Sequence, residues 1–287
     1  MDPALILIQT LNAAQYGLLL FLVASGLTLI FGVMGVINLA HGSFYMMGAY
    51  LAFSLSALTG NLLLTILIGV GLSVALGAVL EWALVSHLYR RNHLQQVLLT
   101  YGLILVFDDL RSMLVGDEVY SVPVPAWLDY SVPLGDVMTY PAYRLFMSGV
   151  CLLIALGLYL LIQRTLVGAR IRAGAFNRDM VQLLGININL LYRLVFAVGV
   201  GLAAFAGMIN APASTVSPGM GTQVLIVSFV VVIVGGIGSV WGALLASLLI
   251  AFADTFGKVF FPDYAGISIY VVMAAILLWR PEGLFKA

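Results

Sequence analysis

Charge is scarce in this sequence of 287 residues, because only 8% of the residues are charged while 63% are hydrophobic and the mean hydropathy is +1.13. Soluble globular proteins carry about 25% charged residues. A soluble fold this apolar would expose large greasy patches to water. The composition therefore excludes an ordinary soluble domain and supplies enough apolar residues for about nine bilayer spans of ~20 residues each.

Lysine and cysteine are almost missing, and their absence excludes several chemistries. The only lysines are Lys258 and Lys286, and neither completes a phosphate loop of the form G-x-x-x-x-G-K-[ST], so this chain has no such route to ATP. The single cysteine, Cys151, excludes an internal disulfide and a multi-thiolate zinc site. The three histidines lack H-E-x-x-H spacing, and no G-x-S-x-G turn is present. We therefore expect that the chain has no catalytic residue, binds no cofactor or metal itself, and is not an enzyme.

The formal net charge is zero, because the sequence has twelve basic and twelve acidic residues. A balanced chain has no net positive field to hold nucleic acid, so we expect no nucleic-acid partner. No basic residue precedes Arg90, so the amino terminus lacks the basic region of a cleavable signal peptide, and we expect it to be retained.

The apolar runs predict an all-α polytopic membrane protein that forms one domain, residues 1–287. Nine crossings are expected, or eight or ten if the run near 32–41 or 211–240 is re-entrant. The predicted spans are 5–31, 42–58, 62–85, 97–115, 143–163, 194–211, 223–239, 241–257 and 266–280. Glycine-rich breaks at 35–49 and 235–246 suggest a weak inverted repeat of the kind seen in transporters.

The basic residues set the predicted orientation, since they concentrate in cytoplasmic segments of membrane proteins. Nine of the twelve fall in three places: a loop near 90, a loop at about 164–193, and the carboxy-terminal tail. They are Arg90, Arg91, Arg164, Arg170, Arg172, Arg178, Arg193, Arg280 and Lys286. The loop at about 116–142 carries acidic residues instead: Asp117, Glu118, Asp129 and Asp136. We expect this loop and the amino terminus outside and the carboxy terminus in the cytoplasm.

Two glycines and two polar side chains interrupt the apolar stretch at 31–42. Loosened backbone survives at membrane depth only inside protein or beside a wet cavity, so Asn38 and His41 are expected to face the bundle interior. The alternative is that Asn38 simply caps a helix that starts near Leu39.

The cytoplasmic segment 170–185 has a helical apolar pattern. Phe176, Met180, Leu183 and Leu184 recur at helical spacing and predict one short amphipathic helix that stops at Gly185. From the residues alone, this helix either docks on a soluble partner or lies among lipid headgroups.

Small residues and charges mark two further places. The Gly-rich stretch holds Gly235, Gly236, Gly238 and Gly242, and the four-residue recurrence of Gly238, Gly242 and Ala246 predicts close helix packing.

Four ionisable residues lie within the third and fourth spans: Glu81, Asp108, Asp109 and Arg111. Asp108 and Arg111 are one turn apart and are expected to neutralise each other, which leaves Asp109 as the more interesting charge.

Several stretches in order resemble the permeases of branched-chain amino-acid ABC importers, specifically the shorter LivH-type subunit. These stretches are FGVMGVINLAHGSFYMMGAYLAF at 31–53, QQVLLTYGLIL at 95–105, RAGAFNRDMVQLLGIN at 172–187, GGIGSVWGALLAS at 235–247 and WRPEGLF at 279–285. Together they span nearly the whole chain.

The resemblance implies a multi-pass subunit of the bacterial inner membrane that takes a solute from an extracytoplasmic binding protein. A second, LivM-like permease would complete the pathway, and two separate ATP-binding subunits would use ATP. It implies a translocation path at Asn38, Ala40, His41, Gly42 and Thr100. It also implies that the cytoplasmic segment docks on an ATPase, through Arg172, Phe176, Met180, Leu183, Leu184 and Gly185. Family members carry branched-chain or other amino acids, urea, amides or small aromatic acids, so the cargo stays open.

Two other functions compete with the importer permease. A stand-alone ion-coupled carrier would use Asp108, Asp109 or Glu81 as its cation site. A passive channel is disfavoured, because no ring of charges and no carbonyl-rich filter sequence is evident.

Overall fold

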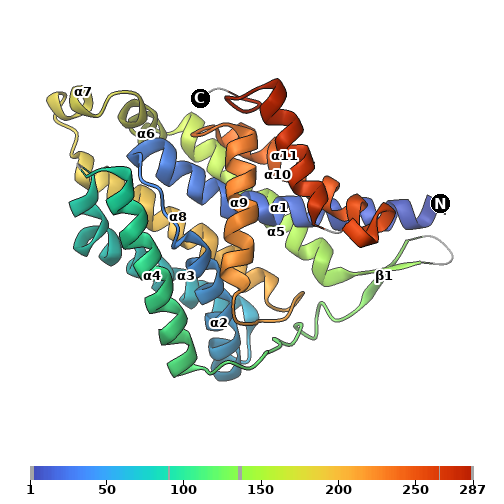
Figure 1. Cartoon of the computed structure of the whole chain (residues 1–287). Coiled ribbons are helices and arrows are strands. Elements are labelled where there is room, and N and C mark those ends of the chain that lie inside the picture. The colour runs from blue at the N-terminus through green and yellow to red at the C-terminus, as the bar shows by residue number, and fades with distance from the viewer. Residues whose placement is uncertain (1–2, 90, 135–137, 265, 286–287) are drawn as a thin grey trace.

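The computed structural model describes residues 3–89, 91–134, 138–264 and 266–285. These residues form a bundle of helices with very little strand (Figure 1). The α-helices are α1 (Pro3–Met34), α2 (His41–Thr59), α3 (Leu62–Ala83), α4 (His93–Leu114), α5 (Ala142–Arg164), α6 (Leu166–Phe176), α7 (Arg178–Leu183), α8 (Ile188–Asn210), α9 (Met220–Gly235), α10 (Val240–Phe260) and α11 (Ile267–Trp279). Two short 3-10 helices, η1 (Val85–Leu88) and η2 (Pro262–Tyr264), and the antiparallel strands β1 (Ser131–Pro133) and β2 (Thr139–Pro141) complete the described elements.

Each of the nine predicted apolar runs contains a helix. By length and composition, α1, α3, α5, α8 and α10 can each cross a membrane, and α9 and α11 are shorter apolar helices. The all-α polytopic class is therefore confirmed, while the number of spans stays a prediction. The small β1–β2 hairpin in the loop 116–142 was not predicted, because three-residue strands leave no periodic signal.

The 32-residue helix α1 passes through the middle of the bundle and packs against α5, α8, α9 and α10. Close packing of α2 on α8 depends on glycine. A Cβ at Gly48 would lie 2.0 Å from the Ala204 carbonyl oxygen, and one at Gly207 would lie 2.0 Å from the Tyr45 carbonyl oxygen. Lipid gives no hydrophobic driving force between helices, so the van der Waals contacts that this close approach allows help to hold α2 on α8.

The connections between helices gather at two ends of the bundle, which we call the α7 end and the hairpin end (Figure 1). At the hairpin end, Tyr120 pairs with Val216 through two backbone hydrogen bonds of 2.8 Å, and the Tyr140 hydroxyl reaches Asn12. At the α7 end, the Thr100 hydroxyl lies 3.4 Å from the Ile37 carbonyl.

The carboxy-terminal tail closes the turn between α9 and α10 at the α7 end. The backbone N–H groups of Leu284 and Phe285 donate to the carbonyls of Val234 (2.8 Å) and Gly235 (3.2 Å). These carbonyls belong to the last turn of α9, where the C=O groups find no N–H donor within the helix. The tail therefore supplies the hydrogen bonds that the end of α9 lacks.

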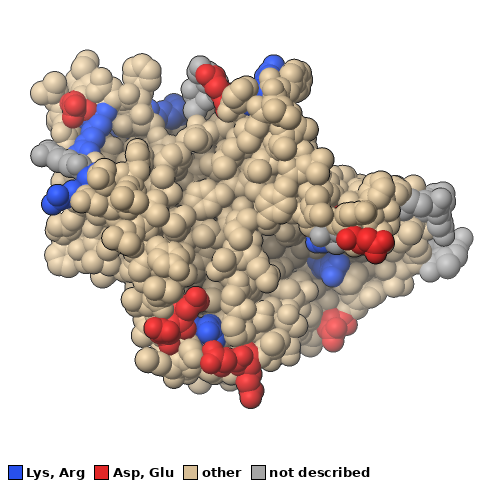
Figure 2. Space-filling model, in the orientation of Figure 1, with Lys and Arg blue, Asp and Glu red and all other residues tan. Residues whose placement is uncertain are grey.

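Basic residues follow the same division, as the uneven distribution of blue and red in Figure 2 illustrates. The three described basic residues outside the predicted cytoplasmic set lie near the hairpin end and are all engaged. Arg111 pairs with Asp117, Lys258 pairs with Asp254, and Arg144 donates to Asn12. Arg90, Asp136 and Lys286 lie outside the described residues.

Candidate translocation pathway

A polar cavity of about 690 Å³ opens between α1, α2, α10 and the connection from α8 to α9. Figure 2 shows a hollow on the molecular face with basic atoms inside it. The charged and amide-bearing or phenolic side chains in its lining are Asn12, Gln15, Tyr16, Tyr45, Arg144, Asn210, Gln223, Asp254 and Lys258. Lipid cannot solvate such a set, so the cavity must hold water or a polar solute.

An ion pair on α10 forms one wall of the cavity. Lys258 Nζ lies 2.5 Å from Asp254 Oδ2, and the Asp254 side chain is only 5% exposed while that of Lys258 is 56% exposed. Sequence reasoning missed both residues. The available signal was a carboxylate and an ammonium four residues apart inside an otherwise apolar run, which helix periodicity places on one face.

Arg144 of α5 is a second cationic group in the cavity lining and is held by Asn12. The Arg144 guanidinium donates to Asn12 Oδ1 over 2.8 Å, and the Tyr140 hydroxyl donates to the same oxygen over 3.1 Å. Burial raises the pKa of the Tyr140 phenol, although the nearby Arg144 charge lowers it. The phenol thus remains a donor, and the arginine is fixed with its charge at the cavity.

The cavity ends at Val23 and Tyr45, and the predicted glycine break lies directly beneath them. The His41 Nε2 atom lies 2.9 Å from the Val23 carbonyl, which can only accept, so Nε2 carries the hydrogen. Tyr45 accepts from the Asn210 amide over 2.8 Å. Two of the cavity residues therefore contact His41 and α8 directly.

The break itself is confirmed. Gly35 has φ +66°, α2 begins only at His41, and the side chains of Asn38 and His41 are fully buried. The capping alternative for Asn38 is wrong, because Ala40 occupies the N-cap position and the Asn38 amide has no hydrogen-bond partner among the described residues. Buried unpaired amides are costly, which marks this position as unusual.

The other residues expected in the path surround the break. Ala40 is fully buried, and a Cβ at Gly42 would lie 2.1 Å from the Gly221 carbonyl oxygen, so α2 and α9 touch here. Thr100 is buried on α4 and bonds to its own helix at the Gln96 carbonyl (2.9 Å). It contacts the break through Ile37 and does not line the cavity.

The Gly-rich stretch packs closely at the junction of two helices. Gly235 of α9 meets Gly242 of α10, since a Cβ at Gly242 would lie 1.9 Å from the Gly235 carbonyl oxygen. Gly236 and Gly238 have φ of +95° and +85° and form the turn before α10. Gly238 therefore lies before α10, and the close packing predicted for these glycines occurs where the end of α9 meets the start of α10.

The glycine break at 31–42 and the Gly-rich stretch meet each other in this turn. A Cβ at Gly32, at the end of α1, would lie 2.6 Å from Gly238 Cα. The inverted repeat itself stays a prediction.

The cytoplasmic segment forms two helices rather than one. Asn177 is extended and ends α6 at Phe176, and its side chain accepts from the Met180 N–H over 2.9 Å to cap α7. The single amphipathic helix is therefore wrong, because the apolar pattern concealed a capping residue. Gly185 does end α7, with φ +80° and the paired backbone bonds of a Schellman motif.

The apolar side chains of this segment are exposed as docking requires. Phe176 is 94%, Leu183 85%, Leu184 70% and Met180 56% exposed. Arg172 points elsewhere, since its guanidinium donates to the Ile162 carbonyl at the end of α5. It stabilises the base of the segment rather than its exposed face.

The ionisable residues within the third and fourth spans are paired differently from the prediction. Arg111 does not neutralise Asp108. It pairs with Asp117 over 2.8 Å and lies over the Tyr50 ring. The loop that follows α4 folds back and offers this carboxylate, and bonds from Arg111 and Ser112 lower the pKa of Asp117. Asp109 is exposed.

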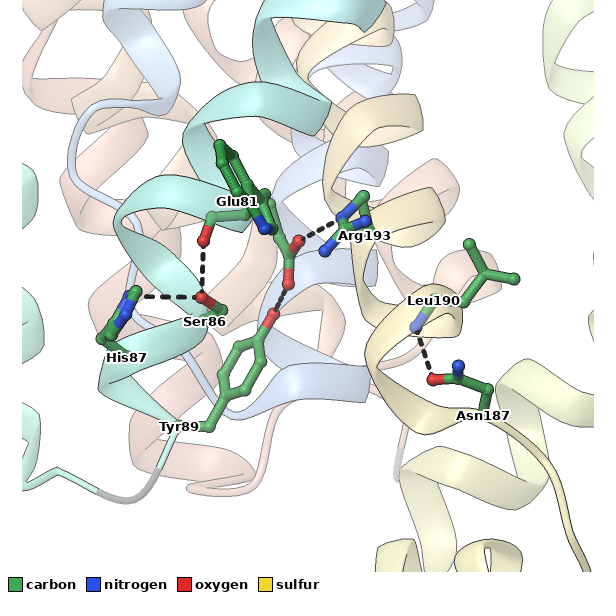
Figure 3. Close-up of polar contacts among 8 residues, drawn as sticks. Glu81, Ser86, His87, Tyr89, Asn187, Leu190 and Arg193 are labelled. Carbon is green, nitrogen blue, oxygen red and sulfur yellow. Dashed lines mark hydrogen bonds and ion pairs between the residues drawn. The ribbon is translucent and has the colours of Figure 1, made fainter.

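Glu81 is fully buried and doubly engaged at the α7 end (Figure 3). Arg193 Nε lies 2.9 Å from Glu81 Oε2, and the Tyr89 hydroxyl donates to Oε1. Within the described residues, the buried carboxylates are Glu81 and Asp254, and each is in an ion pair. A cation site for an ion-coupled carrier therefore gains no support from an unpaired buried carboxylate in this part of the chain.

Comparison with known proteins gives one consistent result. Residues 9–277 match the family described as the permease component of the branched-chain amino acid transport system. The high-affinity branched-chain amino acid permease BraD of Pseudomonas aeruginosa is 30% identical over 96% of this chain and 94% of its own length. LivH of Escherichia coli K12 is 26% identical over the same shares. A probable LivH permease of Methanocaldococcus jannaschii is 28% identical over 95% of this chain and 90% of its length. No solved structure matches.

Proposed function

The chain belongs to the family of branched-chain amino acid transport permeases, and from this premise we propose that it carries an amino acid through the membrane as a subunit of an ATP-binding-cassette importer. The cavity carries the proposal, because a single polar space of about 690 Å³ presents both a carboxylate and two cationic groups. An amino-acid zwitterion needs this pairing of charges. Its carboxylate would bind Arg144 or Lys258, and its ammonium group would bind Asp254.

The same charges favour an amino acid over the other solutes of related systems. Urea and simple amides carry no charge and gain little from an ion pair. A small aromatic acid would use the cations and leave Asp254 without a role. A branched-chain amino acid adds an apolar side chain, and Leu19, Leu20 and Val224 in the cavity lining offer contacts for it.

The basic residues support the proposed orientation. With the α7 end in the cytoplasm and the hairpin end outside, the cavity opens toward the side from which a binding protein would release its solute. The bonded break at Val23, His41 and Gly42 then closes the inner half. Transport would open this closure and shut the outer cavity in alternation.

Partner subunits supply what this chain lacks. Two ATP-binding subunits would provide ATP hydrolysis, and one of them would dock on the exposed apolar residues of α6 and α7. An extracytoplasmic binding protein would contact the hairpin end. A second permease would complete the pathway within the lipid of the inner membrane.

Reconstitution tests the proposal. The chain, a second permease, the ATP-binding subunits and the binding protein are placed in liposomes, and uptake of radiolabelled leucine is measured. We expect uptake that requires both ATP and the binding protein. Uptake that persists without either one would refute the proposal. Uptake by the isolated chain under an imposed proton or sodium gradient would establish the ion-coupled carrier instead.

A further inference from the structure

The helix α7 is joined to the membrane bundle by few side chains. It packs on α6 and α8, and its exposed residues Met180 and Leu183 are free of the bundle. Val181 is its buried apolar residue, at 2% exposed. Val181, the chain ends of α7 and Arg178 at its first position are contacts through which a displacement of α7 can reach the bundle.

Arg178 contacts two aromatic rings that belong to other elements. Its guanidinium lies 5.8 Å from the ring centroid of Tyr89, in the connection between α3 and α4, and 5.7 Å from that of Tyr192 in α8. The two rings meet edge to face with centroids 5.0 Å apart. A cation over two ring faces is attracted to both, so Arg178 holds α7 against this aromatic pair.

Tyr89 links this contact to a buried ion pair. Its hydroxyl donates to Glu81, whose other oxygen accepts from Arg193 of α8 (Figure 3). Burial and the bond to Glu81 raise the pKa of Tyr89, so the phenol keeps its hydrogen. A fully buried carboxylate such as Glu81 depends on these partners, so it fixes their positions.

The far end of α8 reaches the transport cavity. The Gly207 backbone touches the Tyr45 carbonyl, and both Tyr45 and Asn210 line the cavity. The helix α8 therefore contributes Tyr192 and Arg193 to the cluster at one end and Asn210 to the cavity lining at the other.

We infer that Arg178 is a positioning residue for ATP-driven transport, which transmits displacement of α7 to α8 through Tyr89, Tyr192 and the buried Glu81–Arg193 pair. The inference rests on the proposed function and specifies how ATPase motion reaches the cavity. It assigns Glu81 a mechanical role, in place of the cation site considered from the sequence. Arg178 acts through α8 and does not touch the solute.

The test uses the complete reconstituted importer and measures the amount of leucine imported per ATP hydrolysed. We expect Arg178→Ala to lower this ratio about five- to thirtyfold while ATP hydrolysis continues. Tyr89→Phe keeps the ring beneath Arg178 but removes the bond to Glu81, and it should lower the ratio in the same way. The double variant should lose no more than the worse single variant, because both changes interrupt one path.

Two controls separate coupling from folding. Arg170→Ala removes an exposed arginine of the same loop and should leave the ratio unchanged. Arg178→Lys keeps a cation over the rings and should restore part of the ratio.

Normal ratios in Arg178→Ala and Tyr89→Phe complexes would overturn the inference. If Arg178→Ala does not assemble, Tyr89→Phe decides alone, since its site lies outside α7. Failure of the unmodified complex to import leucine with ATP would refute the proposed function itself.

Discussion

The ion pair of Asp254 and Lys258 predicts unequal consequences for removing its two members. The Asp254 side chain is 5% exposed and that of Lys258 56% exposed, although the two charged atoms are only 2.5 Å apart. In Asp254→Asn, the lysine is left where water already reaches it, so the loss is that of an exposed pair, about 0–1 kcal/mol. In Lys258→Ala, the buried carboxylate loses its cation, and the cost approaches the ~3–5 kcal/mol of a broken buried pair.

The assay is thermal unfolding of the purified chain in detergent, followed by the loss of the monodisperse chromatographic peak. We expect Lys258→Ala to unfold at a clearly lower temperature than Asp254→Asn. The double variant Asp254→Asn with Lys258→Ala should recover most of the loss, because no buried charge then remains unpaired. Equal destabilisation by the two single variants would refute the reasoning, as would a double variant no more stable than Lys258→Ala.

Three further predictions concern packing, docking and pH. Leu183→Arg puts a charge on the exposed apolar face of α7 and should uncouple ATP hydrolysis from leucine uptake in the reconstituted importer. Gln182→Arg on the same helix should leave the coupling unchanged. Normal coupling in the Leu183→Arg complex would refute α7 as the contact for the ATPase. Gly48→Ala should destabilise the chain by about 1–3 kcal/mol, because its Cβ would lie 2.0 Å from a carbonyl oxygen of α8, while Gly71→Ala, with open space around its Cβ, should be neutral or stabilising in the same unfolding assay. Hydrogen bonds lower the pKa of Asp117 in the folded chain, so the stabilising effect of its carboxylate is complete above the ordinary pKa of 3.8 and is lost as the pH falls through the lower folded value. The difference in unfolding temperature between the unmodified chain and Asp117→Asn should therefore stay constant from neutral pH to about pH 5 and shrink only in stronger acid. A difference that shrinks near neutral pH would contradict the assignment.

Sequence patterns predicted what depends on local rules. Apolar runs gave the helices because lipid enforces a closed backbone hydrogen-bond pattern. The same rule placed Asn38 and His41 inside the bundle, and both are fully buried. Gly185 was predicted as a helix stop because its position requires positive φ, and φ is +80°.

What failed depended on competition or on distance. The apolar spacing from Phe176 to Leu184 predicted one helix, but the Asn177 side chain offers the backbone a better local partner as a cap. Arg111 pairs with Asp117 and not with Asp108, which is closer in sequence, because the loop after α4 folds back onto the helix. The cavity was not predictable, since α1, α2 and α10 bring its residues together from distant parts of the chain.

The tail that closes the turn between α9 and α10 has a consequence for the order of synthesis. The ribosome makes Leu284 and Phe285 after α9, α10 and α11, yet these residues supply the bonds that complete the end of α9. Until they are made, the carbonyls of Val234 and Gly235 lack these hydrogen-bond partners. The hydrogen bonds that complete the end of α9 therefore form late in synthesis, after α10 and α11 have been made.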